Sequence, residues 1–389
     1  MVHIWDMWVK YSDEGELIHM RKEMAAKFGV EVDNAMETLP PSFSPIQNPD
    51  AKCNSQYKAF EWMGLLHWYI IPVAWELGFN REVLENFVQF VNIIEVAMSH
   101  SPKSDEDIAA LYNLVKSFLK EFERLYVHNN PEKVSRCRLC IWQLIHVPMH
   151  IASNGSIRFG SQATVEHAIG EIGHKVRSKK APIANIATML HERAITKVLS
   201  LQFPDLKIPS KEKRDKEHLY QSIAIKKKEI SHPSVHYDHL AAICDYFEIP
   251  LDTDVPIQRW GKCVIPGDIT LRSRISEEVG KASRSSRYFE AQENDDSDEP
   301  IFGKALAFYS LQQADIEYSL VVYHKLLKTQ DVYGRVCGRF SKDPVAMETF
   351  RITKLVGIWK YEERVHILRR HVGLDLLNLE QDGFEEQEL

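Results

Sequence analysis

The sequence predicts an α+β protein, with a mainly α-helical N-terminal two-thirds followed by a small antiparallel β domain. Apolar residues recur at helical spacing from residue 58 to about 203, as expected for helices that bury one face. From Pro300 the pattern changes to short segments rich in Val, Ile, Tyr and Phe, which are typical of strands. The change falls at an acidic run, Glu293 to Glu299, which has nothing to bury.

Apolar stripes and end signals place the helices. Two stripes indicate two long helices: Leu84, Phe87, Val88, Val91 and Ile94 in the first, and Ile108, Leu111, Leu114, Val115, Phe118 and Phe122 in the second. Ser104 and Asp107 form a capping-box pattern at the start of the second helix. Asn130 and Pro131 predict the start of a third helix, and Pro148 should end it, because proline disrupts a helix interior. Further helices are expected at about 161–178 and 182–202.

The same patterns divide the chain into segments with two separate cores. The segments are an irregular lead-in at 1–57, a mainly helical domain at 58–282, an acidic linker at 283–299, a small β domain at 300–374 and an acidic tail at 375–389. The expected strands are Ile301–Tyr309, Ile316–Tyr323, Val332–Phe340, Leu355–Tyr361 and Val365–Leu368. The last two should pair as an antiparallel hairpin. Trp359 and Tyr361 alternate with Ile358, so one of these two faces should be partly wet.

Charge is distributed unevenly along the chain. The formal net charge is −7 over 389 residues, which excludes a protein that is basic throughout. Residues 131–230 nevertheless contain 18 Lys and Arg against 9 Asp and Glu, a net charge of +9, which leaves −16 for the rest of the chain. A basic middle between acidic ends predicts that one surface meets a polyanion. The apolar stretch from Trp62 to Trp75 is too short to span a bilayer, and the six scattered cysteines are typical of a reduced intracellular protein.

The segment from Gly155 to Lys180 contains the most informative motif. On a helix, one face would be apolar, with Val165, Ala168, Ile169, Ile172 and Val176. A second face would hold Glu166, Gly170, Gly173 and Arg177 at spacings of four, three and four. Glycines weaken a helix, by about 1 kcal/mol each relative to alanine, and can be offset by close approach of a backbone or nucleic acid beside Glu166. The alternative is a solvated glutamate, with glycines that only admit a neighbouring helix.

This segment is similar to the signature of CACTA-type (En/Spm-like) DNA transposases, in the domain of unknown function that follows their main transposase region. Val165-Glu166 matches the apolar residue and glutamate that open a helix there, and Lys175–Lys180 matches the basic stretch that follows. Three further segments resemble the basidiomycete fungal branch: Glu61–Tyr69, Cys137–His146 and Gly155–Arg158. The likeness covers most of the chain, including the C-terminal β domain.

The resemblance implies a ribonuclease H-like nuclease that needs three acidic residues. Two aspartates lie on strands, and a glutamate follows on a later helix after an all-helical insertion. Together they hold the two Mg²⁺ ions used for DNA cleavage. Here the helices at 58–150 match the insertion and Glu166 matches the third acid, although His167 replaces the usual arginine. Upstream, only Asp6 lies in an apolar context, and no strand pair surrounds it. The chain therefore resembles a truncated remnant that has no cofactor alone, whereas the intact parent enzyme uses Mg²⁺.

The basic stretch predicts weak, sequence-independent contact with DNA. Lys175, Arg177, Lys179 and Lys180 lie within six residues and can contact phosphates. The resemblance further implies a nuclear location, and a second copy or an intact transposase as a protein partner. Two other hypotheses remain open: a domesticated DNA-binding or protein-interaction module, and an active enzyme whose missing acids come from elsewhere.

No metal site is predicted. Cys137 and Cys140 precede His146 and His150, but the five-residue gap between the pairs is too short for a zinc site, and core cysteines on a buried helix are expected instead. His167, Glu171 and His174 are interpreted as a solvated polar face, and His232, His236 and His239 lie in a turn-rich stretch where no metal site is expected. The run Lys226–Lys228 fits a nuclear-import or phosphate-contact element.

Overall fold

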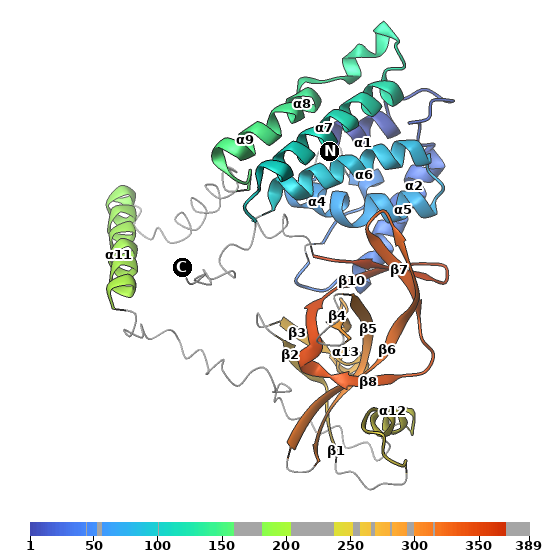
Figure 1. Ribbon diagram of the computed structural model, residues 1–389, viewed down its shortest axis with the longest axis vertical. Helices are drawn as coiled ribbons and strands as arrows, with labels where there is room; N and C mark the ends of the chain where they lie inside the picture. Colours follow the sequence, from blue (N-terminus) through green and yellow to red (C-terminus); the bar gives the residue numbers. More distant parts are fainter. Residues whose placement is uncertain are drawn as a thin grey trace.

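A computed structural model shows an α+β protein with a helical bundle packed on a curled antiparallel sheet (Figure 1). It describes residues 1–43, 45–52, 57–99, 101–158, 181–203, 237–251, 257–265, 269–280, 282–293, 299–313 and 316–370. No helix among these residues has both the length and the apolarity to cross a membrane.

The bundle is built from the first 154 residues. Its elements are α1 (Val2–Val9), α2 (Lys22–Ala35), η1 (Met36–Thr38), α3 (Pro49–Lys52), α4 (Ala59–Gly64), the π-helix η2 (Leu65–Tyr69), α5 (Ile70–Glu76), α6 (Arg81–Met98), α7 (Asp105–Tyr126), η3 (Pro131–Arg136), α8 (Leu139–Trp142), η4 (Gln143–His146) and α9 (Val147–Asn154). The two predicted stripes lie on α6 and α7, and their most apolar members are buried. The capping box of Ser104 and Asp107 is confirmed at the start of α7.

Three details of the helical prediction are wrong. The lead-in is not irregular, because α1 and α2 belong to the bundle core and Trp5 and Trp8 are fully buried. Helix α1 is apolar nearly all round, so it has no periodicity to detect. Pro148 lies in the first turn of α9, where its missing N–H costs nothing, and therefore does not end a helix.

Eleven strands are described beyond the bundle. They are β1 (Ile257–Trp260), β2 (Lys262–Ile265), β3 (Ile269–Arg272), β4 (Tyr288–Gln292), β5 (Pro300–Gln313), β6 (Ile316–Val332), β7 (Arg335–Phe340), β8 (Val345–Glu348), β9 (Ile352–Leu355), β10 (Gly357–Tyr361) and β11 (Arg364–Leu368). The main sheet runs β10-β11-β7-β6-β5-β4-β9, with β1 added to β5 and β8 to β6, while β2 and β3 form a separate hairpin. The sheet curls, because side chains from β4, β5, β6, β7, β10 and β11 meet in one cluster.

The prediction of a linker at 283–299 is wrong for the first half of that segment. Residues 288–292 form β4, which pairs with β5 on one side and β9 on the other. Strand β1, which precedes the segment, also pairs with β5. Arg284 is bound to the bundle, since its guanidinium donates to the carbonyls of Leu39, Pro40 and Phe43 at 2.6–2.9 Å. One continuous sheet therefore extends across the segment that was expected to separate two domains.

The predicted hairpin of β10 and β11 is confirmed, but it joins the two cores. Gly357 to Tyr361 pair antiparallel with Leu368 to Arg364. Trp359 and Leu368 belong to the bundle core, whereas Ile358 packs inside the curled sheet. Trp359 and Ile358 are thus buried on opposite faces, and the strand is partly wet only at its end, where Lys360 is exposed and Tyr361 is half-buried. The bundle core therefore extends into the sheet, which also has hydrophobic clusters of its own, and the two units are joined through shared core residues.

Three more α-helices and one 3-10 helix complete the described structure. The predicted helix at 182–202 is confirmed as α11 (Pro182–Gln202), which stands apart from the bundle in Figure 1. Helix α12 (Tyr237–Phe247) packs on the sheet through Ala242 and Ile243. The short α13 (Arg274–Val279) begins at Ser273, whose side chain accepts from the backbone N–H of Ser276, and η6 (Thr349–Arg351) joins β8 to β9.

Candidate functional site

The site residues predicted from sequence lie outside the described residues. Glu166, Lys175, Arg177, Lys179 and Lys180 all fall within residues 159–180. Their placement relative to the bundle and the sheet therefore stays a prediction. So do the histidines at 167, 174, 232 and 236, together with Glu171 and Lys226–Lys228.

Asp6 does not occupy the position expected for a metal-binding aspartate. It lies on helix α1 and not on a strand, and its carboxylate forms an ion pair with Lys10 at 2.8 Å, one turn along the same helix. Such an i,i+4 ion pair lies on the helix surface and stabilises the helix.

The cysteine and histidine cluster also differs from prediction. Cys140 is exposed and Cys137 is only half-buried, so they are not core residues, and burial raises the pKa of the Cys137 thiol. The helix is interrupted by the 3-10 turn η4. Over the described ranges, no three His, Cys, Asp or Glu side chains are grouped closely enough to hold a metal ion.

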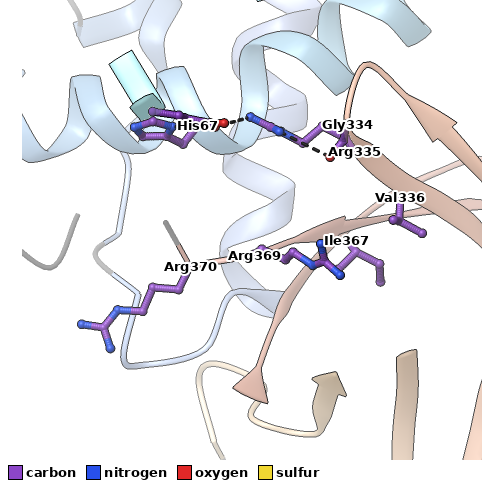
Figure 2. Close-up of a pocket in the computed structure, with 8 residues that line it drawn as sticks. His67, Gly334, Arg335, Val336, Ile367, Arg369 and Arg370 are labelled. Carbon is purple, nitrogen blue, oxygen red and sulfur yellow. Dashed lines mark hydrogen bonds and ion pairs between the residues drawn. The ribbon is translucent and has the colours of Figure 1, made fainter. Parts of the chain in front are cut away.

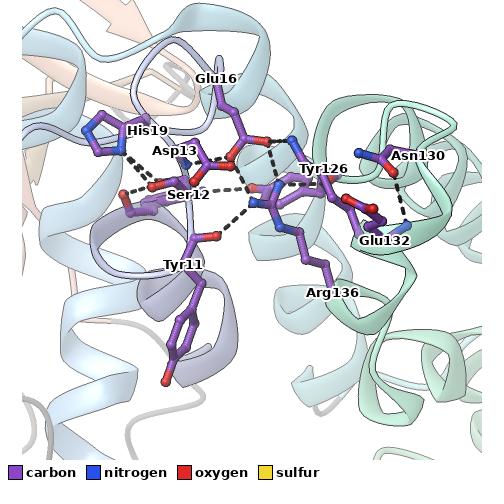
Figure 3. Close-up of polar contacts among 11 residues, drawn as sticks. Tyr11, Ser12, Asp13, Glu16, His19, Tyr126, Asn130, Glu132 and Arg136 are labelled. Atoms are coloured by element: carbon purple, nitrogen blue, oxygen red, sulfur yellow. Dashed lines mark hydrogen bonds and ion pairs between the residues drawn. The ribbon is translucent and has the colours of Figure 1, made fainter.

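A buried polar network fixes the N-terminus to the bundle (Figure 3). The two guanidinium nitrogens of Arg136 donate to the two carboxylate oxygens of Glu16, each at 2.8 Å, and Lys133 adds a further ion pair. Arg136 also donates to the carbonyls of Tyr11 and Tyr126. These hydrogen bonds from Arg136 lower the pKa of Glu16 to about 2. With its donors satisfied inside the protein, the network is structural and presents no group to a ligand.

One pocket lies where the bundle meets the sheet, and we call it the junction pocket (Figure 2). It has a volume of about 270 Å³. Its bundle wall holds the buried His67, on the π-helix, and Glu95, which forms an ion pair with Arg335 at 3.0 Å. Its sheet wall holds Arg369, whose Nε lies 2.9 Å from Glu290, and Arg370, which points away from Arg335 in Figure 2. The arginines in this pocket thus do not converge on one point, and two of them already pair with carboxylates.

A larger pocket of about 680 Å³ lies on the sheet, and we call it the sheet pocket. Its polar lining comes from α12, β1, α13, β6 and the turn after β7: Asp238, His239, Arg259, Arg274, Glu278, His324 and Lys342. Its apolar lining is Ile275, Leu306 and Pro344. The buried His239 is fixed by a 2.8 Å hydrogen bond between its Nδ1 and the hydroxyl of Tyr309.

Positive charge concentrates beside the sheet pocket. Lys304 lies two residues before Leu306 on β5 and directly opposite His324 on β6. Burial and the neighbouring cations Arg287, Arg274 and Lys360 lower the pKa of Lys304. Burial, and then the charge of Lys304, likewise lower the pKa of His324. Of the two carboxylates that line the pocket, Glu278 is exposed and forms an ion pair with Arg274 at 2.8 Å.

Sequence reasoning missed both pockets, because each draws its residues from elements far apart in the chain. Only the sequence KALAF at 304–308, with a lysine inside an apolar strand, gave a local signal. Comparison with known protein families, curated proteins and solved structures finds no match to this chain.

Proposed function

We propose that this chain is a transposon-derived DNA-binding protein, related to the C-terminal part of a CACTA-type transposase, and that it does not cut DNA alone. The observation that carries the proposal is the motif from Gly155 to Lys180, with its apolar residue and Glu166 at the start of a helical pattern and its basic stretch behind. It acts in the nucleus, beside a second copy or an intact transposase.

The order of elements supports this relation. A block of helices, α4 to α9, immediately precedes the motif, as the helical insertion does in the proposed parent family. The segment that contains Glu166 then corresponds to the end of a ribonuclease H-like domain, and the C-terminal sheet follows it.

The environment of Asp6 supports the lack of autonomous cleavage. Two-metal cleavage requires carboxylates clustered around ions about 4 Å apart. Asp6 is the one upstream aspartate in an apolar context, and it is paired with Lys10 on a helix. Asp6 thus does not supply a second acid, and the described residues hold no group of carboxylates that would complete the Mg²⁺ site of the parent enzyme.

DNA contact is assigned to the basic stretch. Lys175, Arg177, Lys179 and Lys180 neutralise backbone phosphates without distinguishing bases, which gives a Kd on the order of 10⁻⁴ to 10⁻⁶ M at physiological salt. The net charge of +9 between residues 131 and 230 adds to the attraction.

A combined binding and cleavage assay tests the proposal. Purified protein is incubated with labelled duplex DNA and Mg²⁺ or Mn²⁺, and bound and nicked DNA are measured in the same sample. We expect binding without nicking, both for the wild type and for Glu166→Ala. Metal-dependent nicking that disappears in Glu166→Ala would show that the chain is an active nuclease. Absence of any binding would refute the DNA-binding role.

A further inference from the structure

We infer that the sheet pocket binds a phosphate-bearing ligand, either a nucleotide unit of a nucleic-acid strand or a free nucleotide. Cations reach it from separate elements: Arg259 from β1, Arg274 from α13 and Lys342 from the turn after β7, with Lys304 on β5 beside it. Residues so far apart in the sequence converge only because the sheet brings them together.

The protein compensates these cations only in part, through the charge of Glu277 on Lys304 and of Asp343 on His324. Among the described residues, no carboxylate lies within ion-pair distance of Arg259, Lys304 or Lys342, whereas Arg274 pairs with Glu278. The guanidinium of Arg259 instead lies 6.0 Å from the centre of the Tyr309 ring. Cations held close together without counter-charges disfavour one another and attract an anion.

The pair of Lys304 and His324 is the strongest single indication. They face each other across β5 and β6. The imidazole of His324 is neutral near pH 7 because its pKa is lowered, so the cations that crowd Lys304 are Arg287, Arg274 and Lys360. The lowered pKa values of both side chains reflect burial together with this crowding of cations. A bound phosphate would offset the repulsion between Lys304 and these arginine and lysine neighbours.

The shape of the pocket suits a phosphate attached to a larger group. A volume of about 680 Å³ is within the range of small-molecule sites, which is roughly 300–1,000 Å³, and exceeds what one phosphate needs. Ile275, Leu306 and Pro344 supply an apolar surface for a sugar or base next to the cations. Asp238 and Glu278 remain in the lining and limit the net positive charge.

Lysine footprinting of the whole chain locates the ligand. Amines are acetylated briefly without ligand and with inorganic phosphate, deoxythymidine monophosphate, a ten-residue oligothymidine or uncharged thymidine, and each lysine is then quantified by mass spectrometry. We expect the phosphate-bearing probes to protect Lys304 and Lys342 at least three-fold, with no protection by thymidine. Lys354, an exposed lysine of β9, is the internal control. If the oligonucleotide protects these lysines most, the bound phosphate belongs to a nucleic-acid backbone. If the mononucleotide protects them most, the ligand is a free nucleotide.

Variants separate binding from a merely structural role. Lys304→Gln should lower the affinity for the phosphate-bearing probe about ten-fold, since it removes a charge-assisted contact. Arg259→Gln should lower it by a similar factor. Lys304→Gln should also raise the melting temperature of the ligand-free protein, because it removes a partly buried cation that Arg287, Arg274 and Lys360 crowd. Lys354→Gln should change neither quantity. A lower melting temperature for Lys304→Gln, or equal weakening by Lys354→Gln, would overturn the inference, as would the failure of every phosphate-bearing probe to protect.

The inference rests on the proposed function only for the source of the phosphate. If the variant that lacks the four cations of the basic stretch loses DNA binding but keeps phosphate protection at Lys304, both proposals stand. If that variant binds DNA normally while Lys304 is still protected, only the role of the basic stretch fails.

Discussion

Loss of the carboxylate of Glu16 should cost substantial stability. It receives both guanidinium nitrogens of Arg136, which is itself buried. We expect Glu16→Gln to lower the free energy of unfolding by about 3 kcal/mol, because a buried cation loses its counter-charge. Urea unfolding followed by tryptophan fluorescence measures this. Glu121→Gln, which removes an exposed partner of Arg124, should cost less than about 1 kcal/mol, and equal costs would contradict the assignment.

The lowered pKa of Glu16 predicts how acid weakens the protein. Its pKa is about 2 when folded, against 4.5 ordinarily, chiefly because of the hydrogen bonds from Arg136. The unfolded chain binds this proton first as the pH falls, so the stabilisation is complete above pH 4.5 and is lost between pH 4.5 and 2. The difference in unfolding free energy between wild type and Glu16→Gln should shrink over this window. A difference that stays constant down to pH 2 would be inconsistent with the network.

His366 gives a second pH dependence, closer to neutrality. It is fully buried on β11, and its Nε2 donates to Glu76 at 2.7 Å. Burial lowers its pKa below 6.5, so the unfolded chain binds this proton first, and stability falls as the pH drops below 6.5. In His366→Gln, the glutamine amide can still donate to Glu76, but it does not bind a proton in this pH range. Between pH 7.5 and 5.5 the wild type should lose stability relative to this variant, and parallel profiles would exclude the titration.

At the scale of elements, helices with local signals were predictable and elements without them were not. The capping box of Ser104 and the apolar stripe of α7 depend on neighbouring residues alone, and so does the start of α11 at Pro182. Helix α1 lacks periodicity because almost all its residues are apolar. Strand β4 is five residues long and adjoins an acidic run, and it forms because β5 and β9 pair with it from both sides.

Gly303 tests the packing of the sheet at the β4, β5 and β6 layer. A Cβ at this position would lie 2.4 Å from Cζ of Phe289 and 2.6 Å from Cδ2 of Tyr323, and both rings are buried. We expect Gly303→Ala to destabilise the protein by about 1–3 kcal/mol through overpacking. Thermal unfolding by circular dichroism measures the effect. An unchanged melting temperature would mean that the rings can move aside.

For the whole molecule, the expected division into two cores fails because of contacts that no local pattern reveals. Trp359 enters the bundle core from the sheet, and Arg284 binds three bundle carbonyls. We therefore expect one calorimetric unfolding transition for bundle and sheet together, with Trp359→Ala lowering its midpoint because a fully buried ring is lost. Two separated transitions in the wild type would contradict the shared core.

The candidate sites also differ in whether the sequence alone could predict them. Glu166 and the basic stretch were found because their motif is continuous in the sequence, whereas the sheet pocket joins α12, β1, α13, β6 and the turn after β7. Such a site appears only once the pairing of Lys304 with His324 is known.

The salt dependence of DNA affinity tests the central claim most directly. Fluorescence anisotropy gives the Kd of labelled duplex DNA between about 50 and 200 mM salt for the wild type and for the variant with Lys175, Arg177, Lys179 and Lys180 all changed to Ala. The account predicts a steep wild-type slope of log affinity against log salt. The variant's slope should be smaller by about three to four, with equal weakening for unrelated DNA sequences. A wild-type affinity independent of salt, or a variant that binds as the wild type does, would contradict it.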